Sequence, residues 1–232
     1  MDQLTQLLDL TLFWEYRQIL LSGLLQNLLV FLIAGLVAIK LGFWAALARV
    51  SQRRALRFVG TVHVELFRNS PEYMLLIWVY VALPLVLGVI FGQKINIAPF
   101  IAAVIAIGFA FSGYFGETFR AGIQSVPRGH IDAAYAVGMS WPQIMRRIVL
   151  PQALRRVLPE SLNICISLLK VTTIVSLVTV PDLMYRVGLI TMSEMRPLPL
   201  YTGAALTYFF LVLAFTMAVR ALTERWRLRG WA

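Results

Sequence analysis

A cluster of polar side chains interrupts the apolar run between residues 162 and 180. Its members are Lys170, Thr172, Thr173 and Ser176. A lysine near the centre of a membrane helix costs about 2.5–3.5 kcal/mol on insertion scales, so its ammonium group should face a wet cavity, a carbonyl group or a counter-charge. Hydroxyl groups beside it could replace water around a zwitterion. We therefore expect these four residues to line a path for a polar solute. The alternative is that Lys170 bonds carbonyl groups of a neighbouring helix and is structural.

Glu117 and Arg120 form a second ionisable group inside an apolar region. Their i to i+3 spacing favours a local ion pair on one helix. Direct contact between Glu117 and a solute is the other interpretation, so Glu117 stays among the candidate path residues.

Neither group suits catalysis. A phosphate-binding P-loop ends in Gly-Lys-Ser/Thr, whereas the three lysines follow Ile39, Gln93 and Leu169. One cysteine and two histidines cannot assemble an ordinary zinc site. A membrane-embedded enzyme would need a converging acid, base or nucleophile, and the spans offer only Lys170 and Glu117. We expect no catalytic residue, metal or cofactor in this chain.

The composition indicates a membrane protein. Of the 232 residues, 59% are hydrophobic and 14% are charged, whereas a soluble domain has about 25% charged residues. A bilayer core about 30 Å thick requires about 20 apolar residues in a helix. Five runs meet this need, at about residues 20–48, 73–91, 97–115, about 162–180 and 201–219. The sequence therefore predicts an all-α, polytopic membrane protein with five transmembrane helices.

The basic residues predict the orientation of these helices. Fifteen of the 21 lysines and arginines lie on one side of the predicted membrane and four on the other. The positive-inside rule then places the N-terminus outside and the C-terminus in the cytoplasm. The net charge of +10 is explained by this topology, and we expect no nucleic-acid partner. We expect an amphipathic segment on the outer surface at residues 1–19, a transmembrane domain at 20–222 and a cytoplasmic tail at 223–232.

The longest hydrophilic connection, at residues 128–151, has the pattern of two short helices. Gly138 can end the run "HIDAAYAV" in the left-handed conformation. Ser140 and Gln143 then form a capping box that starts a second helix. Three alanines give the first helix a small face that suits docking into a groove of a partner: Ala133, Ala134 and Ala136.

This loop also matches a known motif. The matching residues are Asp132, Ala133, Ala134, Gly138, Ile148, Leu150 and Pro151. They resemble the EAA loop of permease subunits of bacterial ATP-binding cassette (ABC) importers, except that Asp132 stands where the family usually has Glu. Three further segments resemble polar amino-acid permeases: "VELFRNSP", "YFGETFRAGIQSVPRGH" and "LLKVTTIVSLVTVPDL".

The resemblance implies a type I ABC importer permease fold in the bacterial inner membrane. It also implies four kinds of partner: a second permease subunit, identical or homologous; two ATPase subunits that bind ATP and magnesium; an extracytoplasmic binding protein; and an amino acid or close derivative as the solute. The seven matching loop residues would couple the permease to the ATPases. An ATP-independent channel or secondary carrier is the alternative function.

Overall fold

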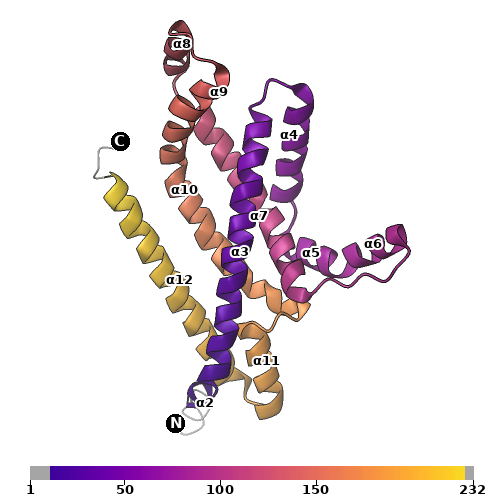
Figure 1. The fold of residues 1–232 in the computed structure, drawn as a ribbon. Coiled ribbons are helices and arrows are strands. Elements are labelled where there is room, and N and C mark those ends of the chain that lie inside the picture. Colours follow the sequence, from indigo (N-terminus) through magenta and orange to yellow (C-terminus); the bar gives the residue numbers. More distant parts are fainter. Residues whose placement is uncertain (1–10, 228–232) are drawn as a thin grey trace. The chain divides into compact units, whose positions relative to one another are not determined.

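The computed structural model describes residues 11–227, and helices are the only regular elements in that part of the chain. Figure 1 shows them in chain order. The α-helices are α2 (Thr11–Glu15), α3 (Arg17–Arg49), α4 (Arg54–Arg68), α5 (Glu72–Ile77), α6 (Leu83–Phe91), α7 (Pro99–Gln124), α8 (Arg128–Ala136), α9 (Trp141–Ile144), α10 (Leu150–Val171), α11 (Leu183–Glu194) and α12 (Pro197–Arg227). Two π-helical segments, η1 (Trp78–Ala82) and η2 (Met145–Val149), and one 3₁₀ segment, η3 (Thr172–Val178), continue neighbouring helices.

Five helical runs are long and apolar enough to cross a membrane, which confirms the predicted number. They are Arg17–Arg49, Glu72–Phe91, Pro99–Gln124, Trp141–Val178 and Pro197–Glu224. The third and fourth runs extend well beyond their predicted cytoplasmic ends. Charged side chains in those extensions ended the apolar windows without ending the helices.

The predicted terminal segments fall partly outside the described residues. Of the expected surface segment 1–19, residues 11–15 form α2 and α3 begins at Arg17, whereas residues 1–10 are not described. Helix α12 continues through Arg227, and residues 228–232 of the expected tail are not described. Helix α4, in the first connection, is an element that the sequence analysis did not anticipate.

The chain divides into two compact units. Unit 1 comprises the residues up to Gly35, Pro71–Gly108 and Ile166–Ala218. Unit 2 comprises Leu36–Ser70, Phe109–Cys165 and the residues from Val219 onward. Each unit brings together segments that are distant in sequence, so the polar contacts between those segments cannot be read from local spacing.

Each unit has its own apolar core. In unit 1 the buried residues are Leu12, Leu20, Leu183, Val187, Ile190, Leu200 and Ala204. In unit 2 they are Ile123, Val126, Ala134, Ile144, Val149 and Ala153. Close helix packing supports unit 2 further: a Cβ added at Gly42 would lie 2.6 Å from the Cβ of Phe115. Any larger residue at position 42 would push α3 away from α7.

Two prolines explain the two π-helical segments. A proline inside a helix has no N–H to donate, and its ring collides with the carbonyl group four residues earlier. At Pro84 and Pro151 the helix widens instead of breaking: the N–H of Leu83 donates to the carbonyl oxygen of Trp78, and that of Leu150 to Met145, each five residues back. Such π-helical turns occur frequently at functional sites.

Candidate coupling loop and solute path

The loop between α7 and α10 has the two short helices that its sequence predicts. Helix α8 ends at Ala136, and Gly138 follows its C-cap with a φ of 79°, in the left-handed region. The Gly138 N–H donates to the Tyr135 oxygen at 2.9 Å, and the Met139 N–H to the Ala134 oxygen at 3.1 Å. These two bonds constitute a Schellman motif, which satisfies the last carbonyl groups of the helix. The predicted role of Gly138 as a helix terminator is confirmed.

The predicted capping box is also present. The side-chain oxygen of Gln143 accepts a hydrogen bond from the Ser140 N–H at 2.9 Å, and Ser140 has extended backbone angles. Helix α9 therefore starts where the sequence indicates, and it leads through η2 into α10.

The seven residues that match the EAA loop divide into two groups. Asp132, Ala133, Gly138 and Pro151 are exposed. Ala134 is only 3% exposed and belongs to the core of unit 2, where it packs with Ile144 and Val149. Ile148 and Leu150 are partly buried against the same core. The methyl group of Ala134 therefore faces the core of its own unit in this structure, and its predicted part in coupling stays a prediction.

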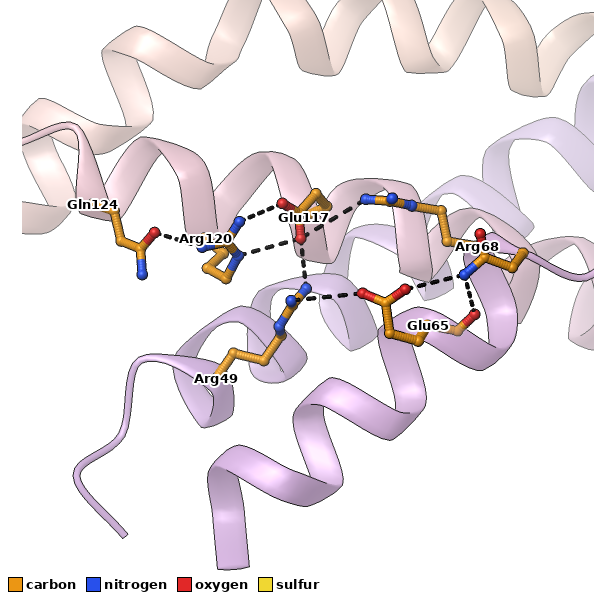
Figure 2. A network of polar contacts seen from close by, with 7 residues as sticks. Arg49, Glu65, Arg68, Glu117, Arg120 and Gln124 are labelled. Atoms are coloured by element: carbon orange, nitrogen blue, oxygen red, sulfur yellow. Dashed lines mark hydrogen bonds and ion pairs between the residues drawn. The ribbon is translucent and has the colours of Figure 1, made fainter. Parts of the chain in front are cut away.

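Figure 2 shows an ionic network that surrounds Glu117 in unit 2. Arg120, on the same helix, binds both carboxylate oxygens, with its Nε 3.2 Å from Oε2. Arg49 of α3 contributes a second guanidinium group, whose Nη1 lies 2.5 Å from Oε2. More distant contacts complete the network: Arg68 of α4 at 3.9 Å from Glu117, and Glu65 at 3.8 Å from Arg49.

This network confirms the predicted pair and adds three residues. The i to i+3 pair of Glu117 and Arg120 was visible in the sequence. Arg49, Glu65 and Arg68 were not, because they come from α3 and α4. One carboxylate thus joins three helices, and its oxygens already accept several hydrogen bonds from guanidinium groups.

A cavity of about 350 Å³ lies beside Glu117. Thr118 of α7, Ser125 just after it, and Arg156 and Glu160 of α10 are among the residues that line it. The Arg156 guanidinium group donates to the Ser125 carbonyl oxygen at its edge. The place of Glu117 on the wall of this cavity is compatible with solute contact, which stays a prediction. A larger cavity of about 720 Å³ is lined by η1, α6 and residues 92–97, and none of the candidate residues lines it.

The polar cluster after residue 169 belongs to unit 1. Lys170 lies in the last turn of α10, and its side chain is exposed in the single chain. The hydroxyl groups bond the backbone of their own helix: Thr172 donates to the Leu169 oxygen at 2.7 Å, and Thr173 to the Lys170 oxygen at 2.9 Å. Ser176 donates to the Thr173 oxygen at 3.3 Å.

Thr172 differs from the other three candidates because its surface is completely buried. Its carbonyl oxygen accepts a hydrogen bond from the Asn27 side chain at 3.0 Å. Thr172 thus belongs to the interior of unit 1, whereas Lys170 is exposed and Thr173 and Ser176 are partly exposed.

Asn27 and Asp182 are two further polar residues that the sequence did not single out. Both are fully buried, and the Asn27 Nδ2 donates to the Asp182 Oδ2 at 3.0 Å. Burial raises the pKa of Asp182 to about 6, although hydrogen bonds from the Tyr185 N–H and from Asn27 oppose that rise. A polar amide in an apolar span was the signal that could have revealed Asn27.

Comparison with known proteins places these features in a family. Residues 38–228 match the family described as "Binding-protein-dependent transport system inner membrane component". Among its relatives is the probable glutamine ABC transporter permease protein GlnM of Bacillus subtilis, which is 29% identical over 94% of this chain and 98% of its own length. Another is the histidine/lysine/arginine/ornithine transport system permease protein HisQ of Salmonella typhimurium, 31% identical over 79% of this chain and 82% of its own length.

Solved structures agree with the sequence comparison. A chain from the crystal structure of an amino acid ABC transporter with histidines has a TM-score of 0.84 and 29% identity, and covers 94% of this chain and 98% of its own length. A chain of the MetNI methionine ABC transporter has a TM-score of 0.68 at 18% identity, covering 91% and 98%. This second likeness concerns the fold alone. The chain belongs to the family of binding-protein-dependent transport system inner membrane components and is a multi-pass permease subunit of an ABC importer.

Proposed function

We propose that this permease imports amino acids or close derivatives, driven by ATP that partner subunits hydrolyse. Its relatives include permeases named for glutamine and for histidine, lysine, arginine and ornithine, and these names support the solute class. The chain would pair with a second permease subunit, two ATPases and an extracytoplasmic binding protein. ATP and magnesium would be held by the ATPases.

The observation that carries this proposal is the exposed loop between α7 and α10. Asp132, Ala133 and the αL turn at Gly138 project from a loop that is anchored by Ala134 in the core of unit 2. A rigid loop that is continuous with a membrane helix suits force transmission. Closure of the ATPases would move the loop, and the attached spans would shift the opening of the solute path from one side of the membrane to the other.

Two glycines provide a matched test of the coupling role. An added Cβ would meet no atom within 4 Å at Gly138 or at Gly188, but only Gly138 has a positive φ. Alanine in the left-handed conformation costs about 1–2 kcal/mol, so Gly138→Ala should weaken capture of the ATPase by the affinity-tagged permease about fivefold or more. Gly188→Ala should leave capture unchanged.

An uptake assay distinguishes an ATP-driven importer from an ATP-independent channel or secondary carrier. In proteoliposomes that contain the co-purified complex and its binding protein, accumulation of radiolabelled amino acids should require ATP and stop with orthovanadate. Uptake that continues without ATP would instead establish a channel or secondary carrier.

The predicted orientation can be tested in the same protein. In a Cys165→Ser background, a cysteine at Ser140 should react with a membrane-impermeant maleimide only from the cytoplasmic side. A cysteine at Met195, which is 81% exposed, should react only from the outside. Reversed labelling would overturn the proposed N-terminus-out topology.

A further inference from the structure

One side-chain amide in unit 1 contacts three separate parts of the chain. Asn27 lies on α3, and its Nδ2 donates to the Thr172 carbonyl oxygen and to the Asp182 carboxylate, both at 3.0 Å. Its Oδ1 accepts from the Leu183 N–H at 3.2 Å and from the Tyr208 hydroxyl at 3.0 Å. An amide side chain has two donor hydrogens and two acceptor lone pairs, and all four are used.

The backbone partners determine the orientation of this amide. The Leu183 N–H can only donate, and the Thr172 carbonyl can only accept. The Asn27 oxygen must therefore face Leu183, and its nitrogen must face Thr172 and Asp182. On the other carboxylate oxygen, Asp182 Oδ1 accepts from the Tyr185 N–H at 2.8 Å. Asp182 thereby caps α11 at the same time as it binds α3.

The segment between these contacts has little regular structure of its own to hold it. Its first seven residues form the 3₁₀ segment η3, a helix type with poorer hydrogen-bond geometry than the α-helix. Thr179 then adopts a φ of 63°, a conformation that is costly for a threonine because its side chain branches at Cβ. Tertiary contacts must therefore hold this segment in place.

Helix α3 supplies some of those contacts from a single face. A Cβ added at Gly23 would lie 2.8 Å from the backbone carbonyl of Asp182, so the helix backbone lies directly against this loop. Gly23 and Asn27 are four residues apart and share one face of α3. The first and last residues of the segment, Thr172 and Asp182, are thus both fastened to one turn of a membrane helix.

We propose that Asn27 and Asp182 are positioning residues of the solute path: they hold the segment 172–182, and with it the exposed side chain of Lys170 and the partly exposed side chain of Thr173, in register on α3. The inference rests on the proposed transport function and adds to it two residues that would touch no solute. The other ionisable groups around Asp182 are Tyr208 of α12 and Tyr185 and Arg186 of α11, and the Arg186 Nε donates to the Pro181 oxygen at 3.1 Å.

Asn27→Asp is the sharpest test because it keeps the shape of the side chain and replaces both donor hydrogens by an acceptor. The new carboxylate would face the Thr172 carbonyl and the Asp182 carboxylate. In proteoliposomes the apparent KM for the transported amino acid should rise about tenfold or more, as expected for loss of a buried hydrogen bond. More ATP should be consumed per solute moved. A purely structural role would lower the amount of folded transporter and leave KM and this ratio unchanged.

Two further variants distinguish the positioning role from simple misfolding. The double variant Asn27→Asp with Asp182→Asn restores a donor between positions 27 and 182 and should recover part of the lost affinity. Tyr208→Phe removes only a bond to the opposite side of the amide and should leave KM within about twofold of the wild type. Wild-type KM in both Asn27→Asp and the double variant would overturn the proposal.

Hydrogen exchange separates this proposal from the transport function itself. With the permease in nanodiscs, the amides of Leu183 and Tyr185 should exchange about tenfold faster or more in Asn27→Asp. This measurement needs no transport. If wild-type complexes move no amino acid, the proposed function fails while exchange still tests the contact. If wild-type complexes transport and the two amides keep their protection in Asn27→Asp, the positioning role fails alone.

Discussion

Each unit contains one polar cluster that joins its own helices, and the two clusters differ in chemistry. Around Glu117 in unit 2, three guanidinium groups and two carboxylates meet, with side-chain exposures from 12% to 49%. Around Asn27 in unit 1, a neutral amide stands at the centre, and it is fully buried together with Thr172 and Asp182. The ion pairs of unit 2 lie where water reaches them, whereas in unit 1 a fully hydrogen-bonded amide and one carboxyl group occupy the interior.

The difference follows from the cost of burial. Leaving a buried hydrogen-bonding group without a partner costs about 1–3 kcal/mol, and an unpaired buried charge costs more. A charged network that is partly exposed is instead screened by solvent, and each outer pair contributes about 0–1 kcal/mol. The Asn27 cluster should therefore be the more sensitive of the two to single substitutions.

Asn27→Leu should have the largest effect. It removes at once the partners of the Thr172 carbonyl, the Leu183 N–H and the Asp182 carboxylate in a fully buried place. We expect a loss of about 4 kcal/mol or more in the free energy of unfolding. Reversible unfolding in mixed micelles measures it, and Gln26→Leu, on the same helix but partly exposed, is the control. If Asn27→Leu and Gln26→Leu were equally stable, the Asn27 cluster would not be the more sensitive of the two clusters.

Titration of Asp182 should have the next largest effect. Its folded pKa of about 6 lies above the ordinary value of 3.8, so between these pH values the folded chain binds a proton that the unfolded chain has released. Stability therefore falls as pH rises from about 4 to 6, by about 3 kcal/mol at most, and this contribution is constant above about pH 7.

The variant Asp182→Asn isolates the contribution of Asp182 to the pH dependence of stability. His63, whose pKa is lowered by burial, adds a slope of the opposite sign around pH 6.5, and it is present in both proteins. The difference between the wild-type and variant profiles should thus slope downward between pH 4 and 6. A flat difference would show that the Asp182 carboxyl group is solvated.

The two clusters also differ in how far they could be predicted. Glu117 and Arg120 are three residues apart, so helical periodicity alone pairs them. Other local signals, a glycine after a helical run and a Ser-x-x-Gln pattern, predicted the turn at Gly138 and the capping box at Ser140. Asn27 and Asp182 are 155 residues apart, and no local rule joins them. Alanine at position 134 looked like a docking contact because the pattern of small residues does not tell which side of a short helix meets its own core.

Glu117→Gln should have an intermediate effect. The amide would keep the shape but remove the nearest negative charge from the guanidinium groups of Arg49 and Arg120, which would leave Glu65 as the remaining carboxylate of the network. Because Glu117 is 27% exposed, solvent should reduce the penalty to about 2 kcal/mol, below the 3–5 kcal/mol that is typical of a fully buried pair. High salt should reduce the difference in the free energy of unfolding between Glu117→Gln and the wild type. A penalty larger than that of Asn27→Leu would reverse the comparison.

Arg68→Gln should have the smallest effect and thereby locate the edge of the charged network. Its guanidinium group is 3.9 Å from Glu117 and its side chain is 37% exposed, whereas Arg49 is 2.5 Å from the same carboxylate and 12% exposed. We expect Arg68→Gln to change the free energy of unfolding by less than about 1 kcal/mol, and Arg49→Gln to cost clearly more. Equal losses would mean that both arginines share the Glu117 charge, and that the network extends across α4 as strongly as across α3.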